Sequence, residues 1–158
     1  MRSIIVFIFC SSLIFFYNCH SKDFDKNNKQ QLLDSLNCII LNRDSTSLSI
    51  IDIYKVNNIL NKSIIDYNSA HSNNFISNNI SRSKILLENY KKQLVPSLNE
   101  NNEKVVWVNC ICDDVELGPK DDWKKSVIKV YDGGNCFFNV FINLSKNNWS
   151  QFKVNDNG

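Results

Sequence analysis

Cysteine is the residue type in this chain with the widest chemical range, because a thiol can form a disulfide, bind a metal or carry a lipid. Four of the six cysteines lie beyond the N-terminal region: Cys38, Cys110, Cys112 and Cys136. In an exported protein this even number predicts up to two disulfides. The alternative is that these cysteines are free and buried as small apolar residues. A bond between Cys110 and Cys112 would strain disulfide geometry, because the two side chains lie on the same side of an extended segment. We therefore expect one of them to bond Cys136 or to reach Cys38.

A further cysteine, Cys19, follows an apolar leader. Arg2 precedes the apolar run Ile4–Tyr17, which only Ser11 and Ser12 interrupt. This run is shorter than the roughly 20 apolar residues that span a bilayer, and its length is typical of the apolar core of a signal peptide. The alternative is a retained membrane anchor or a buried helix.

The residues around Cys19 favour lipid attachment over ordinary signal cleavage. Phe16 and Asn18 are not the small residues that an ordinary cleavage site needs, and the chain becomes polar at His20. A cysteine at this place resembles the acylated cysteine of bacterial lipoproteins, which becomes the first residue after cleavage. We expect residues 1–18 to be a signal peptide and Cys19 to carry acyl chains such as palmitate. The mature protein would then be anchored to a membrane of the cell envelope, on its periplasmic or surface face.

Other patterns of catalytic or metal-binding residues are weak. His71 lies in a polar segment without an orienting partner nearby in the sequence, and His20 lies close to Cys19. The Cys-Ile-Cys spacing at Cys110 is tighter than that of paired zinc ligands, and the acidic segment Asp113–Asp122 lacks the regular calcium-loop spacing. We therefore expect no metal and no cofactor. The balance of 18 basic against 16 acidic residues argues against a nucleic-acid partner.

The spacing of apolar residues changes at Pro96. Before this residue, apolar side chains at helical spacing predict helices over about 29–41, over a segment that includes Ile53 to Tyr67, and from Ser81 to Pro96. After it, apolar and polar residues alternate, which predicts antiparallel strands. The expected strands are Lys104–Cys112, Ser126–Tyr131, Cys136–Leu144 and a short one over Gln151–Val154.

A hairpin is predicted between the second and third of these strands. Asp132-Gly133-Gly134 suits a three-residue loop with a left-handed glycine. This loop would place Val130 opposite Cys136 and Ile128 opposite Phe138, so that apolar residues share one face.

Helices followed by strands predict an α+β fold, with N-terminal helices packed on a C-terminal antiparallel β-meander of three to five strands. A cystatin-like or NTF2-like arrangement would suit this order by analogy. The length of 158 residues suits one domain. We expect residues 19–29 to form a polar tether and residues 30–158 to form the domain.

Strand alternation also predicts a binding surface. Aromatic and amide residues share the face opposite the cysteines: Trp107, Asn109, Phe137, Asn139 and Phe141. If helices cover only the cysteine face, this second face is free to bind a peptide or glycan by stacking and hydrogen bonding. The alternative is that the loop bearing Trp123, or the segment around Trp149, covers it.

Three C-terminal segments carry a resemblance: Val106–Cys112 (VWVNCIC), Trp123–Lys125 (WKK) and Asp132–Leu144 (DGGNCFFNVFINL). They are similar to the C-terminal third of a group of small uncharacterised Bacteroidetes lipoproteins. The resemblance implies export and a β-meander, and it implies no reaction. We expect a non-enzymatic, lipid-anchored envelope protein that binds an unknown protein or glycan, or has a structural role. The alternative is a small exported enzyme or inhibitor that uses exposed cysteines or the Asp113–Asp122 loop.

Overall fold

The computed structural model describes residues 25–42, 46–71, 84–118 and 122–155. It has a helix over residues 25–35, strand β1 (Cys38–Ile40), helix α2 (Ile50–Ala70), and strands β2 (Tyr90–Leu98), β3 (Lys104–Cys112), β4 (Phe137–Asn143) and β5 (Asn148–Val154). The five strands form one sheet in chain order, and only β1 and β2 pair in parallel. Two helices before a mostly antiparallel sheet confirm the predicted α+β fold.

The expected signal peptide (1–18) and the expected lipidation site Cys19 lie outside the described residues. Within the described ranges, no helix has the length and apolar character needed to cross a membrane.

Helix α2 begins at a capping box. The N–H of Asp52 donates to Ser49 Oγ at 3.1 Å, and the N–H of Ser49 donates to the Asp52 carboxylate at 3.0 Å. The Asp52 carboxylate also lies 2.9 Å from Lys104 Nζ on β3. Although partial burial disfavours its charge, the hydrogen bond from Ser49 and the ammonium of Lys104 hold the pKa of Asp52 below its usual value. The helix predicted around Ile53–Tyr67 is confirmed.

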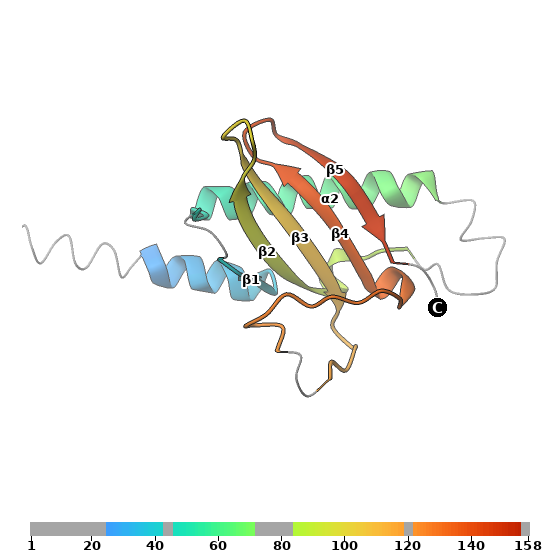
Figure 1. The fold of residues 1–158 in the computed structure, drawn as a ribbon. Coiled ribbons are helices and arrows are strands. Elements are labelled where there is room, and N and C mark those ends of the chain that lie inside the picture. The colour runs from blue at the N-terminus through green and yellow to red at the C-terminus, as the bar shows by residue number, and fades with distance from the viewer. Residues whose placement is uncertain (1–24, 43–45, 72–83, 119–121, 156–158) are drawn as a thin grey trace, which may run out of the picture.

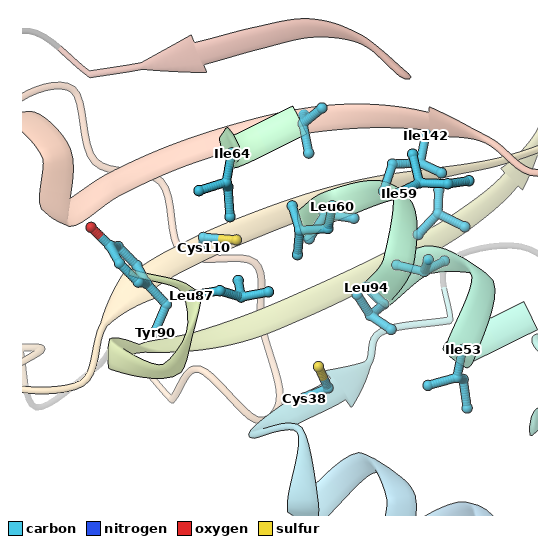
Figure 2. Close-up of a cluster of buried hydrophobic side chains, with 14 of the residues drawn as sticks. Cys38, Ile53, Ile59, Leu60, Ile64, Leu87, Tyr90, Leu94, Cys110 and Ile142 are labelled. Carbon is cyan, nitrogen blue, oxygen red and sulfur yellow. The ribbon is translucent and has the colours of Figure 1, made fainter. Parts of the chain in front are cut away.

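The main core lies between α2 and one face of the sheet (Figure 1). Alternate residues of β3 and β4 point toward the helix and are fully buried: Val106, Val108, Cys110, Phe138, Val140 and Ile142. Side chains of α2 such as Leu60 and Ile64 cover this layer (Figure 2). The faces predicted for residues 104–112 and 138–144 are confirmed on this side of the sheet. Cys136, which was expected to share this face, lies in the 3-10 turn before β4 and packs against the apolar cluster around Ile111.

The first helix begins and ends earlier than the sequence predicts. It covers residues 25–35 instead of 29–41, so that part of the expected tether is helical. Asn37 turns the chain with a left-handed φ of 50°, a conformation that asparagine tolerates at helix ends. The next residues, Cys38–Ile40, are β1, because the branched Ile39 and its neighbours pair with Lys92–Leu94 of β2.

The predicted helix from Ser81 to Pro96 is wrong in its described part. Residues Leu87–Asn89 form a single 3-10 turn, and β2 begins at Tyr90. Pairing with strands on both sides outweighs the helical spacing of apolar residues here.

Pro96 does not end a helix; it lies within β2. The N–H of Lys92 donates to Asn37 O, and the N–H of Leu41 donates to Leu94 O, both at 2.9 Å. Even-numbered residues of β2 therefore direct their backbone polar groups toward β1. Pro96 lies beyond the end of β1 on this side, where its missing N–H leaves no strand hydrogen bond unmade.

The predicted hairpin at Asp132–Gly134 is also wrong. Residues 126–131 form no strand, and β4 pairs with β3 on one edge and β5 on the other. Both edges of β4 are therefore taken, and Ile128 packs against the sheet face instead of pairing with Phe138. The left-handed glycine is confirmed: Gly133 has a φ of 96°, and a Cβ there would lie 2.6 Å from the Phe137 ring.

Candidate functional site

The sheet face turned away from α2 carries an aromatic row at its centre. Val95, Trp107 and Phe141 are register partners on β2, β3 and β4. Phe141 is 38% exposed, and Val95 and Trp107 are half-buried. Trp107 Nε1 donates to Asn139 Oδ1 at 3.3 Å, so the indole is held in place. We call these four residues the Trp107 face.

The neighbouring part of the same sheet face is covered by the segment between β3 and β4 (Figure 1). Ile111 and Phe137 form a small second core with Ile128, against which Trp123 packs. Trp149 instead packs on the α2 side of the sheet. The cover expected from the Trp123 loop is therefore present over one part of the face, and the cover expected from the Trp149 segment is absent among the described residues.

Two buried amides fix the edge of this cover. Gln93 Nε2 donates to Trp123 O at 2.6 Å and to Ser126 O at 2.7 Å. Gln93 Oε1 accepts from Asn109 Nδ2 and from the N–H of Ile128, both at 3.0 Å. Asn109 Nδ2 also donates to Ile128 O at 2.9 Å. Sequence reasoning missed Gln93 because its segment was assigned to a helix; the signal was a polar residue within a strand-forming run.

The predicted binding residues are thus divided by the cover. Phe137 and Asn109 are buried beneath it, whereas Trp107, Asn139 and Phe141 lie outside it. The side-chain carbonyl of Asn139 accepts the hydrogen bond from the Trp107 indole. Among the described residues, the Asn139 Nδ2 has no hydrogen-bond partner. The uncovered part can therefore offer an aromatic surface and an amide donor to a ligand.

The segment between β3 and β4, which we call the covering segment, is closed at its two ends by a disulfide. Cys112, at the end of β3, is bonded to Cys136, just before β4, with their Cα atoms 4.8 Å apart. The expected bond from one cysteine of the Cys-Ile-Cys pair to Cys136 is confirmed, with Cys112 as the partner. Cys38 and Cys110 are free and buried.

The free cysteines lack the features of a nucleophile. Burial raises the pKa of Cys38 to about 11, although the positive charge of Lys92 opposes this increase. Burial raises the pKa of Cys110 as well. A reactive thiol has a lowered pKa and access to solvent. Both of these thiols are buried and have a raised pKa.

A second group of polar residues lies beside the disulfide. One ligand atom each from Cys112, Cys136 and Asp114 falls within 4.8 Å of the others. Both sulfurs are part of the disulfide, so neither can bind a metal as a thiolate. The adjacent cleft of about 440 Å3 also contains Tyr90, whose pKa burial raises to about 12. This group supports neither a metal site nor a proton-transfer site.

The remaining sequence candidates have local structural roles. The ring of His71 hydrogen-bonds to Tyr67 O at 2.8 Å and stacks on the Tyr67 ring at the end of α2. Asp122 pairs with Lys125 at 2.9 Å, and the hydrogen bond from that lysine lowers the pKa of Asp122. His20 and Asp121 lie outside the described residues.

No protein-family model, curated protein or solved structure matches this chain.

Proposed function

We propose that this chain is an exported, lipid-anchored protein of the cell envelope that binds a glycan through the Trp107 face and catalyses no reaction. The observation that carries the binding proposal is the row of Trp107 and Phe141, which remains open beside the covered part of the same sheet face. Aromatic rings stack on the apolar faces of sugar rings, and amides bind sugar hydroxyls. Asn139 supplies such an amide beside the indole, with its Nδ2 available.

Two further observations support export. Disulfides persist in oxidising compartments, and Cys112 and Cys136 form one in the folded domain. The apolar leader that ends before Cys19 has the length of a signal peptide, and a cysteine after it suits lipid attachment. More than one acyl chain would be needed for stable anchoring, because a single chain binds membranes reversibly.

Lipid attachment predicts that Cys19 carries the acyl label. Cells that express the full chain and are fed an alkyne analogue of palmitate should incorporate label into the wild type, and Cys19→Ser should abolish it. Cys10→Ser is the matched control, because it removes a leader thiol and should leave the labelling unchanged. Absence of label on the wild type, or undiminished label on Cys19→Ser, contradicts the anchor.

The Trp107 face predicts that Trp107→Ala weakens glycan binding about tenfold or more, since buried aromatic residues contribute most to such contacts. Binding is measured on a glycan array and then by titration of the best ligand. Tyr131→Ala is the matched control, because Tyr131 is 91% exposed and outside this face. Equal binding by Trp107→Ala and wild type, or no glycan bound by the wild type, contradicts the proposal.

A further inference from the structure

A second cleft, of about 300 Å3, opens on the α2 side of the sheet. The end of the 25–35 helix, α2 and the 3-10 turn Leu87–Asn89 provide its walls, and Lys92 of β2 contributes to its lining. The cleft is separate from the Trp107 face, because even-numbered residues of β2 point toward α2 whereas Val95 points away from it.

Lys92 places a positive charge in this cleft. It is only 4% exposed, and it is the register partner of Cys38 on β1 and of Cys110 on β3. These flanking thiols are buried in the main core, in the layer that Figure 2 shows with Leu87. Lys92 therefore carries an ammonium at a position where its partners on β1 and β3 are the weakly polar Cys38 and Cys110.

The Lys92 ammonium has unused hydrogen-bonding capacity. Its Nζ donates to Leu87 O at 3.2 Å, and that carbonyl already accepts the N–H of Tyr90. An ammonium has three donors, and a buried charge is costly unless an opposite charge is near. Among the described residues, Lys92 forms no ion pair. The cleft therefore offers a buried ammonium that no carboxylate of the described residues pairs with.

Amide groups face the same space from α2. Asn57 and Asn61 are one helical turn apart, and both line the cleft. Within the described ranges, their side-chain amides form no hydrogen bond. Each offers one N–H donor group and one carbonyl acceptor, which complements the donor and acceptor of a peptide group.

Glu88 limits the charge that a ligand can carry. Its exposed carboxylate lines the same cleft and repels a second negative charge. A singly charged carboxylate fits this field better than a phosphate, which is doubly charged near neutral pH.

We propose that this cleft binds the carboxylate of an N-acylated amino acid, either a small molecule or the C-terminus of a peptide. The carboxylate accepts hydrogen bonds from Lys92 Nζ, and the adjacent amide pairs with Asn57 and Asn61. This proposal is independent of the Trp107 face and of the lipid anchor.

Titration of the isotope-labelled full chain, followed by amide NMR shifts, tests this site. The probes are N-acetylglycine and N-acetylglycylglycine, with the neutral N-acetylglycinamide as the matched ligand. We expect saturable shifts around Lys92 with both acids, and binding of the neutral amide that is weaker by about tenfold or more. Tighter binding of the longer acid identifies a peptide C-terminus, and equal binding identifies a small acyl amino acid. Absence of saturable binding, or equal binding of the neutral amide, overturns the proposal.

Variants separate the site from nonspecific charge effects. Lys92→Met keeps the buried stem and removes the ammonium, and it should weaken binding of both acids about tenfold or more. Lys62→Met is the matched control, because Lys62 is exposed on α2 and does not line the cleft. Asn57→Ala/Asn61→Ala tests the amides without altering the core, and it should also weaken binding. Unchanged binding in this double variant or in folded Lys92→Met overturns the proposal.

Discussion

Gln93→Leu is expected to lower the free energy of unfolding by about 3 kcal/mol, because an apolar side chain of similar size cannot hold the covering segment. Gln93 is fully buried, and its amide bonds the carbonyls of Trp123 and Ser126. It also bonds the N–H of Ile128 and the side chain of Asn109. Each buried group left without a partner costs about 1–3 kcal/mol, and movement of the segment into water recovers part of this loss.

Chemical denaturation and amide hydrogen exchange measure this effect. The Ile128 N–H should exchange much faster in Gln93→Leu, and Trp123 fluorescence should shift to the red as the indole becomes exposed. Gln30→Leu is the matched control, because Gln30 is exposed and its side chain, among the described residues, hydrogen-bonds only to Asp34 on its own helix; its change should stay within about 0.5 kcal/mol. A loss below 1 kcal/mol with unchanged exchange at Ile128 would show that these bonds do not hold the segment.

Gln93 and Asn109 also show where sequence reasoning stops. Alternation correctly placed Asn109 on the face away from the cysteines. Alternation identifies the face of a strand, but it carries no information on which segment covers that face. The cover depends on Gln93, which lies on a different strand and bonds carbonyls 30 and 33 residues away. Trp107 remained at the surface and Asn109 did not, although the two are neighbours on one side of β3.

Short apolar runs account for the errors in secondary structure. Residues 29–41 and 85–94 contain apolar residues at helical spacing, yet β1 lies within the first range and β2 begins within the second. A run of this length does not distinguish a helix from a buried strand by spacing alone. The strand is selected by a parallel contact between Cys38–Ile40 and Lys92–Leu94, which are far apart in the chain. By contrast, α2 has its own capping box and several turns of apolar spacing, so its sequence specifies it locally.

Strand register explains which cysteine bonds Cys136. Cys110 is paired with Phe138, and Ile111 with Phe137, so the next pair in the register is Cys112 with Cys136. Sequence reasoning limited the partners but assumed a hairpin before β4, and that hairpin does not form. Once β3 is the neighbour of β4, the bond to Cys112 needs no movement of the backbone.

Removal of this disulfide, by Cys112→Ser/Cys136→Ser, is expected to lower the free energy of unfolding by about 3 kcal/mol. The bond closes a loop between residues 24 apart, and opening it gives the unfolded chain more conformations. Because the bond joins the two ends of the covering segment, its loss should also speed hydrogen exchange at Ile128. Denaturation with and without dithiothreitol measures the effect: the reductant should destabilise the wild type and leave the double variant unchanged.

Cys38→Ala provides the control, because Cys38 is a free thiol and its replacement should preserve the response to dithiothreitol. Alkylation of the native, oxidised protein adds a second readout. Cys38 and Cys110 should resist the reagent until the core unfolds, since burial raises the pKa of both thiols and shields them from solvent. Equal stability of the wild type with and without reductant would show that the Cys112–Cys136 bond does not stabilise the fold. The covering segment would then depend on the hydrogen bonds of Gln93 and Asn109 and on the apolar contacts of Ile128 and its neighbours.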